Sequence, residues 1–564
     1  MKRYKDITLF VLMLCSFINL FAQQEQNDDS HNEQVTIISS FDPSINQAYK
    51  LNYSPDELSF NMDKPQFKYE SLNFDLSTQI NLKPIIPVVI NADKRTTSFN
   101  NSLRAGVGSL FSPYLDFRHS SGQRNSHRLD LTIYQLSTFK NIKNYSPSPE
   151  LKAYTNVNYR KFLSYHILGF ALKYELRSNR FYGFEPDDYQ GLNISETSLK
   201  QSYNLAKASI SLKSNYTSNK KLNHSAKIST YYLFDKHNSS ETFGGVSMDL
   251  HKSFDLTEVL DYQQLGVEAE VKYYANKDSL KSTNNFLVTA TPYFKSNYGK
   301  INFRIGLNFN FLSSKSSDFY FYPILDANFS LIDDYLTIYA GVDGKIDNNS
   351  ILKLSTANPW IESLINTEWL RRFDVYGGIR GNFSQKVNYS AKVYWSKFKN
   401  MAFFVNVQDG INPSLPFNKF SAVYDGGSLI SFDGEITYSA SKKLNILASI
   451  KVYNYSLDSL SEPFHKPSSI LKFGIKYMIT SKISLWSDIY YYGERIAMNP
   501  NPNINLNTIK LDPFIDLNIG VDYTLTENFS VFLNLTNILN NNYQRYLYYP
   551  VQSIQIMGGI AYRF

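Results

Sequence analysis

The last twelve residues of the chain, Ser553 to Phe564, read SIQIMGGIAYRF. Successive side chains of a β-strand point to opposite sides, so this stretch separates into two faces. One face carries Ile554, Ile556, Ile560, Tyr562 and Phe564, and the other carries Gln555, Met557, Gly559, Ala561 and Arg563. A period-two strand that ends the chain on an aromatic residue is typical of the strand that closes a bacterial outer-membrane β-barrel.

The same alternation recurs upstream. In Ile301–Phe311 the odd positions are all apolar, and Ile515–Leu525 and Leu168–Arg177 repeat the pattern. Eleven residues rise about 36 Å, enough for a tilted strand to cross the hydrocarbon layer. We count about 21 candidate strands between Leu103 and Phe564 by this rule. Bacterial single-chain barrels have even numbers, so the pattern predicts an all-β fold: a transmembrane antiparallel β-barrel of about 20 to 22 strands.

The segments between the strands fall into two classes. Short turns are expected at 384–386, 480–482 and 526–528, whereas Glu185–Ser198 and Asn499–Lys510 are long and polar. Short turns at one rim and long loops at the other are typical of outer-membrane barrels.

The first 22 residues have the organisation of a signal peptide. Lys2, Arg3 and Lys5 precede an apolar run, Ile7–Phe21, which meets a plausible cleavage point after Ala22. The only cysteine of the chain, Cys15, lies inside that run. The mature chain would therefore contain neither a disulfide nor a thiolate metal site.

The composition agrees with a barrel. The net charge is +7, of which the leader carries +2, and the excess is too small and too dispersed to indicate nucleic-acid binding. Aromatic residues make up 15% of the chain, with 43 Tyr and 40 Phe, while the mean hydropathy is only −0.32. Many aromatics in a polar average fit a polar lumen, aromatic girdles and an outer wall in contact with outer-membrane lipid.

Residues 23–100 differ from the rest of the chain. They begin with a polar stretch, contain scattered prolines and lack sustained alternation. We therefore divide the chain into a signal peptide (1–22), an extended N-terminal segment on the periplasmic side or in the lumen (23–100), and the barrel (101–564).

The C-terminal region resembles the end of TonB-dependent receptor barrels. The resemblance lies in Glu527–Asn540, Tyr543, Tyr546, Tyr549-Pro550, Gly558-Gly559 and Phe564, and upstream in Asn358-Pro359 and the hairpin Phe373–Phe398. It implies a 22-strand barrel that imports scarce nutrients, such as siderophores or glycans, with energy from an inner-membrane partner.

The chain departs from that family in one respect. The family carries a globular plug of well over a hundred residues before the barrel, and residues 23–100 do not read as a folded domain. Within Gln34–Ser40, the stretch Val35, Thr36, Ile37, Ile38 and Ser39 is similar to the motif that contacts a TonB-type energy transducer. An extended β-prone segment can add a strand to a partner's sheet, although an ordinary extended tail would look the same. The whole chain most resembles plugless TonB-dependent-receptor-like barrels.

Other chemistry finds little support in the sequence. The eight histidines include no pair at helical metal-ligand spacing, no nucleophile motif stands out, and no cofactor is expected, so the chain is not expected to be an enzyme. Glu185, Asp187 and Asp188 could hold Ca²⁺, but a solvated loop is the simpler interpretation, as it is for Asp333-Asp334. Tyr490–Tyr492 and Tyr548-Tyr549 could stack on sugars, but we expect them in an interfacial girdle.

Three functions remain open. Uptake or transport across the outer membrane agrees with the resemblance. A structural subunit of an outer-membrane protein complex, which docks periplasmic or outer-membrane partners, agrees with the missing plug. A passive channel is third, because an open pore of this width would compromise the envelope.

Overall fold

The computed structural model describes residues 99–122, 126–216, 218, 220–363, 366–407, 416–441, 443–500 and 508–564. The predicted signal peptide, the N-terminal segment up to residue 98 and the Val35–Ser39 stretch lie outside the described residues and stay predictions.

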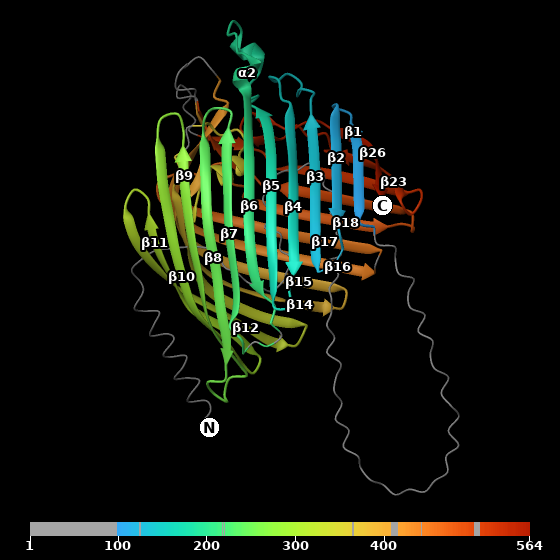
Figure 1. Ribbon diagram of the computed structural model, residues 1–564. Helices are drawn as coiled ribbons and strands as arrows, with labels where there is room; N and C mark the ends of the chain where they lie inside the picture. Colours follow the sequence, from blue (N-terminus) through green and yellow to red (C-terminus); the bar gives the residue numbers. More distant parts are fainter. Residues whose placement is uncertain are drawn as a thin grey trace, which may run out of the picture. The chain divides into compact units, whose positions relative to one another are not determined.

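Twenty-two antiparallel strands form one closed sheet (Figure 1). They are β1 (Asn101–Gly108), β2 (Ser112–Ser120), β3 (His127–Thr138), β4 (Glu150–Phe162), β5 (His166–Arg180), β6 (Lys200–Ser214), β7 (Asn223–Asp235), β8 (Ser240–Phe254), β9 (Tyr262–Lys277), β10 (Ser282–Tyr298), β11 (Ile301–Ser313), β12 (Ser317–Ile332), β13 (Leu336–Asn348), β14 (Trp369–Ser384), β15 (Val387–Val407), β16 (Lys419–Ser441), β17 (Leu444–Leu457), β18 (Ser469–Met478), β19 (Ile483–Tyr492), β22 (Phe514–Thr524), β23 (Phe529–Thr536) and β26 (Gln555–Arg563). The predicted barrel is confirmed, with the larger of the two even strand numbers.

The two ends of the chain's barrel region close the wall. β26 pairs with β1 from Ser102↔Arg563 to Gly108↔Met557, and the Asn101 amide donates to the Phe564 carbonyl at 2.9 Å. Each of the 22 strands therefore has two neighbours, and the wall that the described residues form has no open edge, which suits an apolar surrounding. We call the end of the barrel where Phe564 lies the terminal rim and the opposite end the loop rim.

The longest connections lie at one rim and the shortest turns at the other, as predicted. At the terminal rim, β10–β11, β14–β15 and β16–β17 are each joined by two residues, and the expected turns near 385, 481 and 527 all lie there. The loop rim carries the long connections 181–199, 349–368, 493–513 and 537–554. These contain η1 (Pro186–Tyr189), α2 (Glu196–Leu199), α3 (Ile351–Ala357), and two small hairpins, β20 (Arg495–Met498) with β21 (Thr508–Leu511) and β24 (Gln544–Tyr546) with β25 (Tyr549–Pro550).

Each strand has an apolar outer face. On β5, Phe170 and Leu172 are 43% and 58% exposed, while the intervening positions turn inward and lead to Lys173 and Glu175. On β11 the exposed set includes Ile301, Ile305, Leu307 and Phe311. Contiguous exposed apolar area on this scale marks a surface that meets lipid or another apolar partner.

The seam where the wall closes is tightly packed on its inner side. Gly106 lies opposite Gly559, and a Cβ at Gly559 would lie 2.2 Å from the Ala105 carbonyl oxygen. The Phe532 ring covers these glycines, and the Arg104 guanidinium lies 4.3 Å from the centre of that ring. Small residues are required here because the backbone and an aromatic ring approach closely.

Candidate functional site

The long connections at the loop rim pack on one another around a common apolar cluster. Its ten buried residues are Phe181, Tyr182, Phe184, Leu199, Leu354, Trp360, Ile361, Phe404, Phe420 and Tyr549. They come from connections 181–199, 349–363 and 537–554 and from the loop-rim ends of β15 and β16. We call these three connections, together with 458–468 and the described parts of 493–513, the loop cap.

Tyr549 lies at the centre of the cap and is fully buried. Its ring stacks on the Trp360 indole, with centroids 4.1 Å apart, and its hydroxyl donates to the Asn418 carbonyl. A Cβ at Gly183 would lie 2.5 Å from the Tyr549 ring, which explains the glycine at that position. The expectation that Tyr549 belongs to an interfacial girdle is wrong, because packing between loops buries it.

Hydrogen bonds join the connections of the cap. The Tyr182 hydroxyl donates to the Pro550 carbonyl at 2.9 Å, and the Tyr546 hydroxyl donates to the Ala357 carbonyl at 2.8 Å. A parallel bridge links Ile361 to Phe420, so connection 349–363 continues the sheet at the end of β16. These contacts between connections far apart in sequence make the cap a folded unit.

A buried carboxylate ties the cap to the barrel wall. Glu241, at the start of β8, is fully buried and accepts from the Tyr231 hydroxyl at 2.7 Å. It also accepts from the backbone amides of Ile351 at 2.7 Å and Leu352 at 3.2 Å, which open α3. A carboxylate at a helix N-terminus satisfies amides that have no partner within the helix.

His465 is an unusual member of the cap. It is 8% exposed, and its ring lies against Phe420 and Tyr546, with centroids 5.4 and 5.1 Å away. Within the described part of the chain, neither ring nitrogen has a hydrogen-bond partner, and the backbone is left-handed, with φ of 61°. Burial, with the nearby charges of Arg495 and Lys466, lowers the pKa of His465 to about 3, so the closed cap holds a neutral imidazole.

The lumen wall below the cap carries many charged side chains, and several of them are paired along single strands. Seven ion pairs join residues two apart, which share the inner face of one strand. They are Arg118–Asp116, Arg128–Asp130, Lys173–Glu175, Arg177–Glu175, His251–Asp249, Lys272–Glu270 and Arg372–Asp374. Opposite charges two residues apart on a predicted strand are a signal in the sequence for such pairs, although these pairs were not predicted from it.

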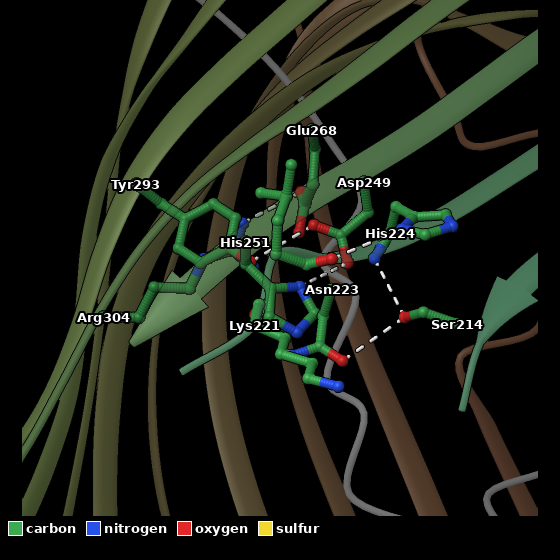
Figure 2. A network of polar contacts seen from close by, with 10 residues as sticks. Ser214, Lys221, Asn223, His224, Asp249, His251, Glu268, Tyr293 and Arg304 are labelled. Atoms are coloured by element: carbon green, nitrogen blue, oxygen red, sulfur yellow. Dashed lines mark hydrogen bonds and ion pairs between the residues drawn. The ribbon is translucent and has the colours of Figure 1, made fainter. Parts of the chain in front are cut away.

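Pairs on neighbouring strands connect into networks. Figure 2 shows one such network on β8 to β11, in which Asp249 meets His251 at 3.1 Å and accepts from the Tyr293 hydroxyl at 3.2 Å. The Arg304 guanidinium lies 4.4 Å from the centre of the Tyr293 ring and pairs with Glu268 at 2.9 Å. The same view includes the Ser214 hydroxyl, which accepts from the His224 amide and donates to Asn223. These contacts fix the inner side chains without filling the lumen with apolar groups.

The predicted closing strand has its apolar face outward. Ile556, Ile560, Tyr562 and Phe564 are 46%, 48%, 43% and 49% exposed, and Ile554 lies just before the strand. The expectation of an interfacial girdle position is also wrong for Tyr492, because its side chain is buried against Phe514.

The acidic residues considered as Ca²⁺ ligands lie outside the buried cluster of the cap. Glu185, Asp187 and Asp188 are exposed around η1, and Asp333 and Asp334 lie in the β12–β13 turn. Among the described residues, no group of three His, Cys, Asp or Glu side chains is arranged to hold a metal ion. In the same part of the chain, no helix has both the length and the apolar character needed to cross a membrane.

Comparison with known proteins gives a clear result for the fold alone. No protein-family model and no curated protein matches the chain. Among solved structures, it is similar to the siderophore receptor PirA from Acinetobacter baumannii, with TM-score 0.61, 12% identity, and 84% of this chain and 81% of that chain covered. The pyoverdine outer membrane receptor FpvA from Pseudomonas aeruginosa PAO1 gives TM-score 0.60 and 13% identity, with 84% and 79% covered.

The ferric-catecholate import receptor Fiu from K12 E. coli gives TM-score 0.58 and 9% identity, with 83% of this chain and 82% of that chain covered. The chain is thus a TonB-dependent-receptor-like β-barrel in fold, with the 22 strands that the resemblance implied.

Proposed function

We propose that the protein resides in the bacterial outer membrane and works in the uptake of a solute through its barrel. The observation that carries this proposal is the combination of a closed 22-strand wall, a charged inner face and a packed loop cap over one rim. A wall of this size encloses a lumen wide enough for a solute. The similar structures include one named as a siderophore receptor and one named as a pyoverdine outer membrane receptor, which supports a ferric siderophore as the solute to be tested first.

The proposal assigns roles to the parts outside the described residues. Residues 1–22 direct export, and residues 23–100 lie on the periplasmic side or in the lumen. Val35, Thr36, Ile37, Ile38 and Ser39 contact a TonB-type transducer by adding a strand to its sheet. The terminal rim then faces the periplasm and the loop cap faces outward, as short turns and long loops do in outer-membrane barrels.

Uptake of ⁵⁵Fe by iron-limited cells tests the proposal. Cells that carry the full chain, a deletion of Val35–Ser39, or no copy are supplied with ferric siderophores from the organism's own medium. The expected result is uptake that falls to the level of the empty strain in the deletion variant, at unchanged protein level in the membrane.

Equal uptake by all three strains contradicts the proposal. Stoichiometric co-purification with other envelope proteins in that case would favour the structural-subunit function. A packed loop cap over the rim argues against a passive open channel, the third possibility.

A further inference from the structure

Four lysines gather on the inner face of neighbouring strands β5, β6 and β7. Lys173 lies directly opposite Lys207 in the β5–β6 ladder, and Lys213 lies diagonal to Lys227 across the β6–β7 ladder. The opposite face of these strands carries Phe170, Ile210 and Ile228, all exposed apolar side chains, so the lysines face the lumen. Along the strands Lys227 lies about 13 Å and Lys213 about 20 Å from Lys207, and the flexible lysine stems shorten the distances between the ammonium groups.

These lysines break the pairing rule of the lumen wall. In the seven pairs named above an acid two residues away neutralises the cation, but the positions two residues from Lys207, Lys213 and Lys227 on their own strands hold no acid. Within the described part of the chain, no ion pair involves any of these three lysines. Lys173 does pair with Glu175, at 2.6 Å, but Arg177 shares the same carboxylate at 3.1 Å. The cluster therefore carries a clear excess of positive charge.

The positions between the lysines are occupied by small side chains. They are Gly169, Ala171, Ser209, Ser211, Ser225 and Ser229. By contrast, the loop-rim halves of β6 and β7 turn Tyr203, Leu205, Tyr231 and Leu233 inward, and these are buried in an apolar cluster. Serine hydroxyls and ammonium groups are both hydrogen-bond donors. Although Tyr231 lies opposite Lys207 and the Lys173 ammonium lies 5.5 Å from the centre of the Tyr154 ring, Lys207, Lys213 and Lys227 are all exposed.

We propose that Lys173, Lys207, Lys213 and Lys227, with the serines between them, form a binding site for a small multivalent oxyanion, a solute with several carboxylate or phosphate groups. Like charges placed directly opposite one another in a sheet are destabilising, and an anion between them reverses the sign of that interaction. The inference rests on the proposed function, because it names the class of solute that the barrel carries. It concerns binding at the wall and needs no energy transducer.

Isothermal titration of the purified full chain in detergent tests the site, with citrate and pyrophosphate as separate probes for carboxylate and phosphate. The variants are K207Q/K227Q, the charge-retaining K207R/K227R, and the control K272Q/K451Q, which removes two lumen lysines that already have acidic partners. The expected result is saturable binding of at least one probe, weakened about tenfold or more in K207Q/K227Q and retained in the other two variants.

Salt should weaken this binding, because the contacts are ionic. The absence of saturable binding of both probes to the full chain, or equal affinity in all variants, overturns the proposal. Failure of the iron-uptake experiment with this binding intact would remove the transport function and leave the anion site. The two inferences can therefore fail separately.

Discussion

The loop cap and the lumen wall are built on opposite principles. The cap is held by buried aromatic rings and by hydrogen bonds between connections far apart in sequence, such as Tyr182 to Pro550. The wall below is lined by ion pairs between residues two apart on one strand, most of them partly exposed to the lumen. The cap should therefore respond strongly to a single substitution and to pH, whereas the wall should tolerate the loss of one charge. Movement is expected in the cap rather than in the wall, because the wall is a continuous sheet.

The largest effect is expected for Trp360→Ala. The substitution removes the buried indole that stacks on Tyr549, and truncation of a buried tryptophan costs about 3–5 kcal/mol. Hydrogen exchange of connections 181–199 and 537–554 should accelerate, while the heat-dependent gel mobility of the barrel stays that of the wild type. The control is Trp395→Ala, whose ring is 41% exposed on the wall and contributes nothing to the cap. Unchanged exchange in the Trp360→Ala cap would show that the loops do not depend on this core.

A comparable but more local effect, centred on the start of α3, is expected for Glu241→Ala. It leaves the Tyr231 hydroxyl and two amides of α3 without their acceptor, and each unsatisfied buried group costs about 1–3 kcal/mol. Hydrogen exchange of the Ile351 and Leu352 amides should accelerate in Glu241→Ala. Glu241→Gln keeps an acceptor oxygen, so its exchange rates should lie between those of the wild type and those of Glu241→Ala. Equal exchange in Glu241→Ala and the wild type would contradict the anchoring role of this carboxylate.

Acidification should loosen the cap through His465. Its pKa is about 3 in the closed cap and returns to about 6.5 when the ring meets water, so the opened form binds the proton more tightly. The contribution to closure is fully present above pH 6.5 and falls as the pH drops toward 3, by about 2 kcal/mol at pH 5. Protection factors of the cap amides, corrected for intrinsic exchange, measure this. His465→Asn, which tolerates the left-handed backbone, should remove the dependence between pH 7 and 5, and a slope that persists in that variant would assign the effect elsewhere.

The smallest effect is expected for Arg128→Gln in the lumen wall. The Arg128–Asp130 pair is 30% and 24% exposed and water screens it, so its loss should cost less than about 1 kcal/mol. The temperature at which the barrel loses its compact gel mobility should move by only a few degrees or less. A loss as large as that of Trp360→Ala would erase the contrast between wall and cap.

The sequence predicted the wall far better than the cap. Alternation in Ile301–Phe311 and Ser553–Phe564 depends on neighbours along one strand, and the structure places both stretches in the wall. The even strand number follows from closure, which a count along the chain cannot provide. Asn358-Pro359 was singled out by resemblance, and both residues lie in the cap, where the Asn358 side chain accepts from the Trp360 amide at 3.0 Å.

The cap could not be derived in the same way, because its contacts join loops separated by hundreds of residues. Tyr549 looked like a girdle residue from its place near a strand end, and only the approach of Trp360 and Gly183 shows that it is buried. The lysine cluster was also missed. Lys173 and Lys207 are seen to lie opposite each other only when the register of β5 and β6 is known.

Conductance of the full chain in planar lipid bilayers tests most directly whether the packed loops close the barrel. The wild type is predicted to pass no steady ionic current, and a Trp360→Ala/Tyr549→Ala double variant, which removes the centre of the cap, is predicted to show discrete open steps. A wild type that conducts steadily, or a double variant as silent as the wild type, would contradict the claim that this cap is the closure.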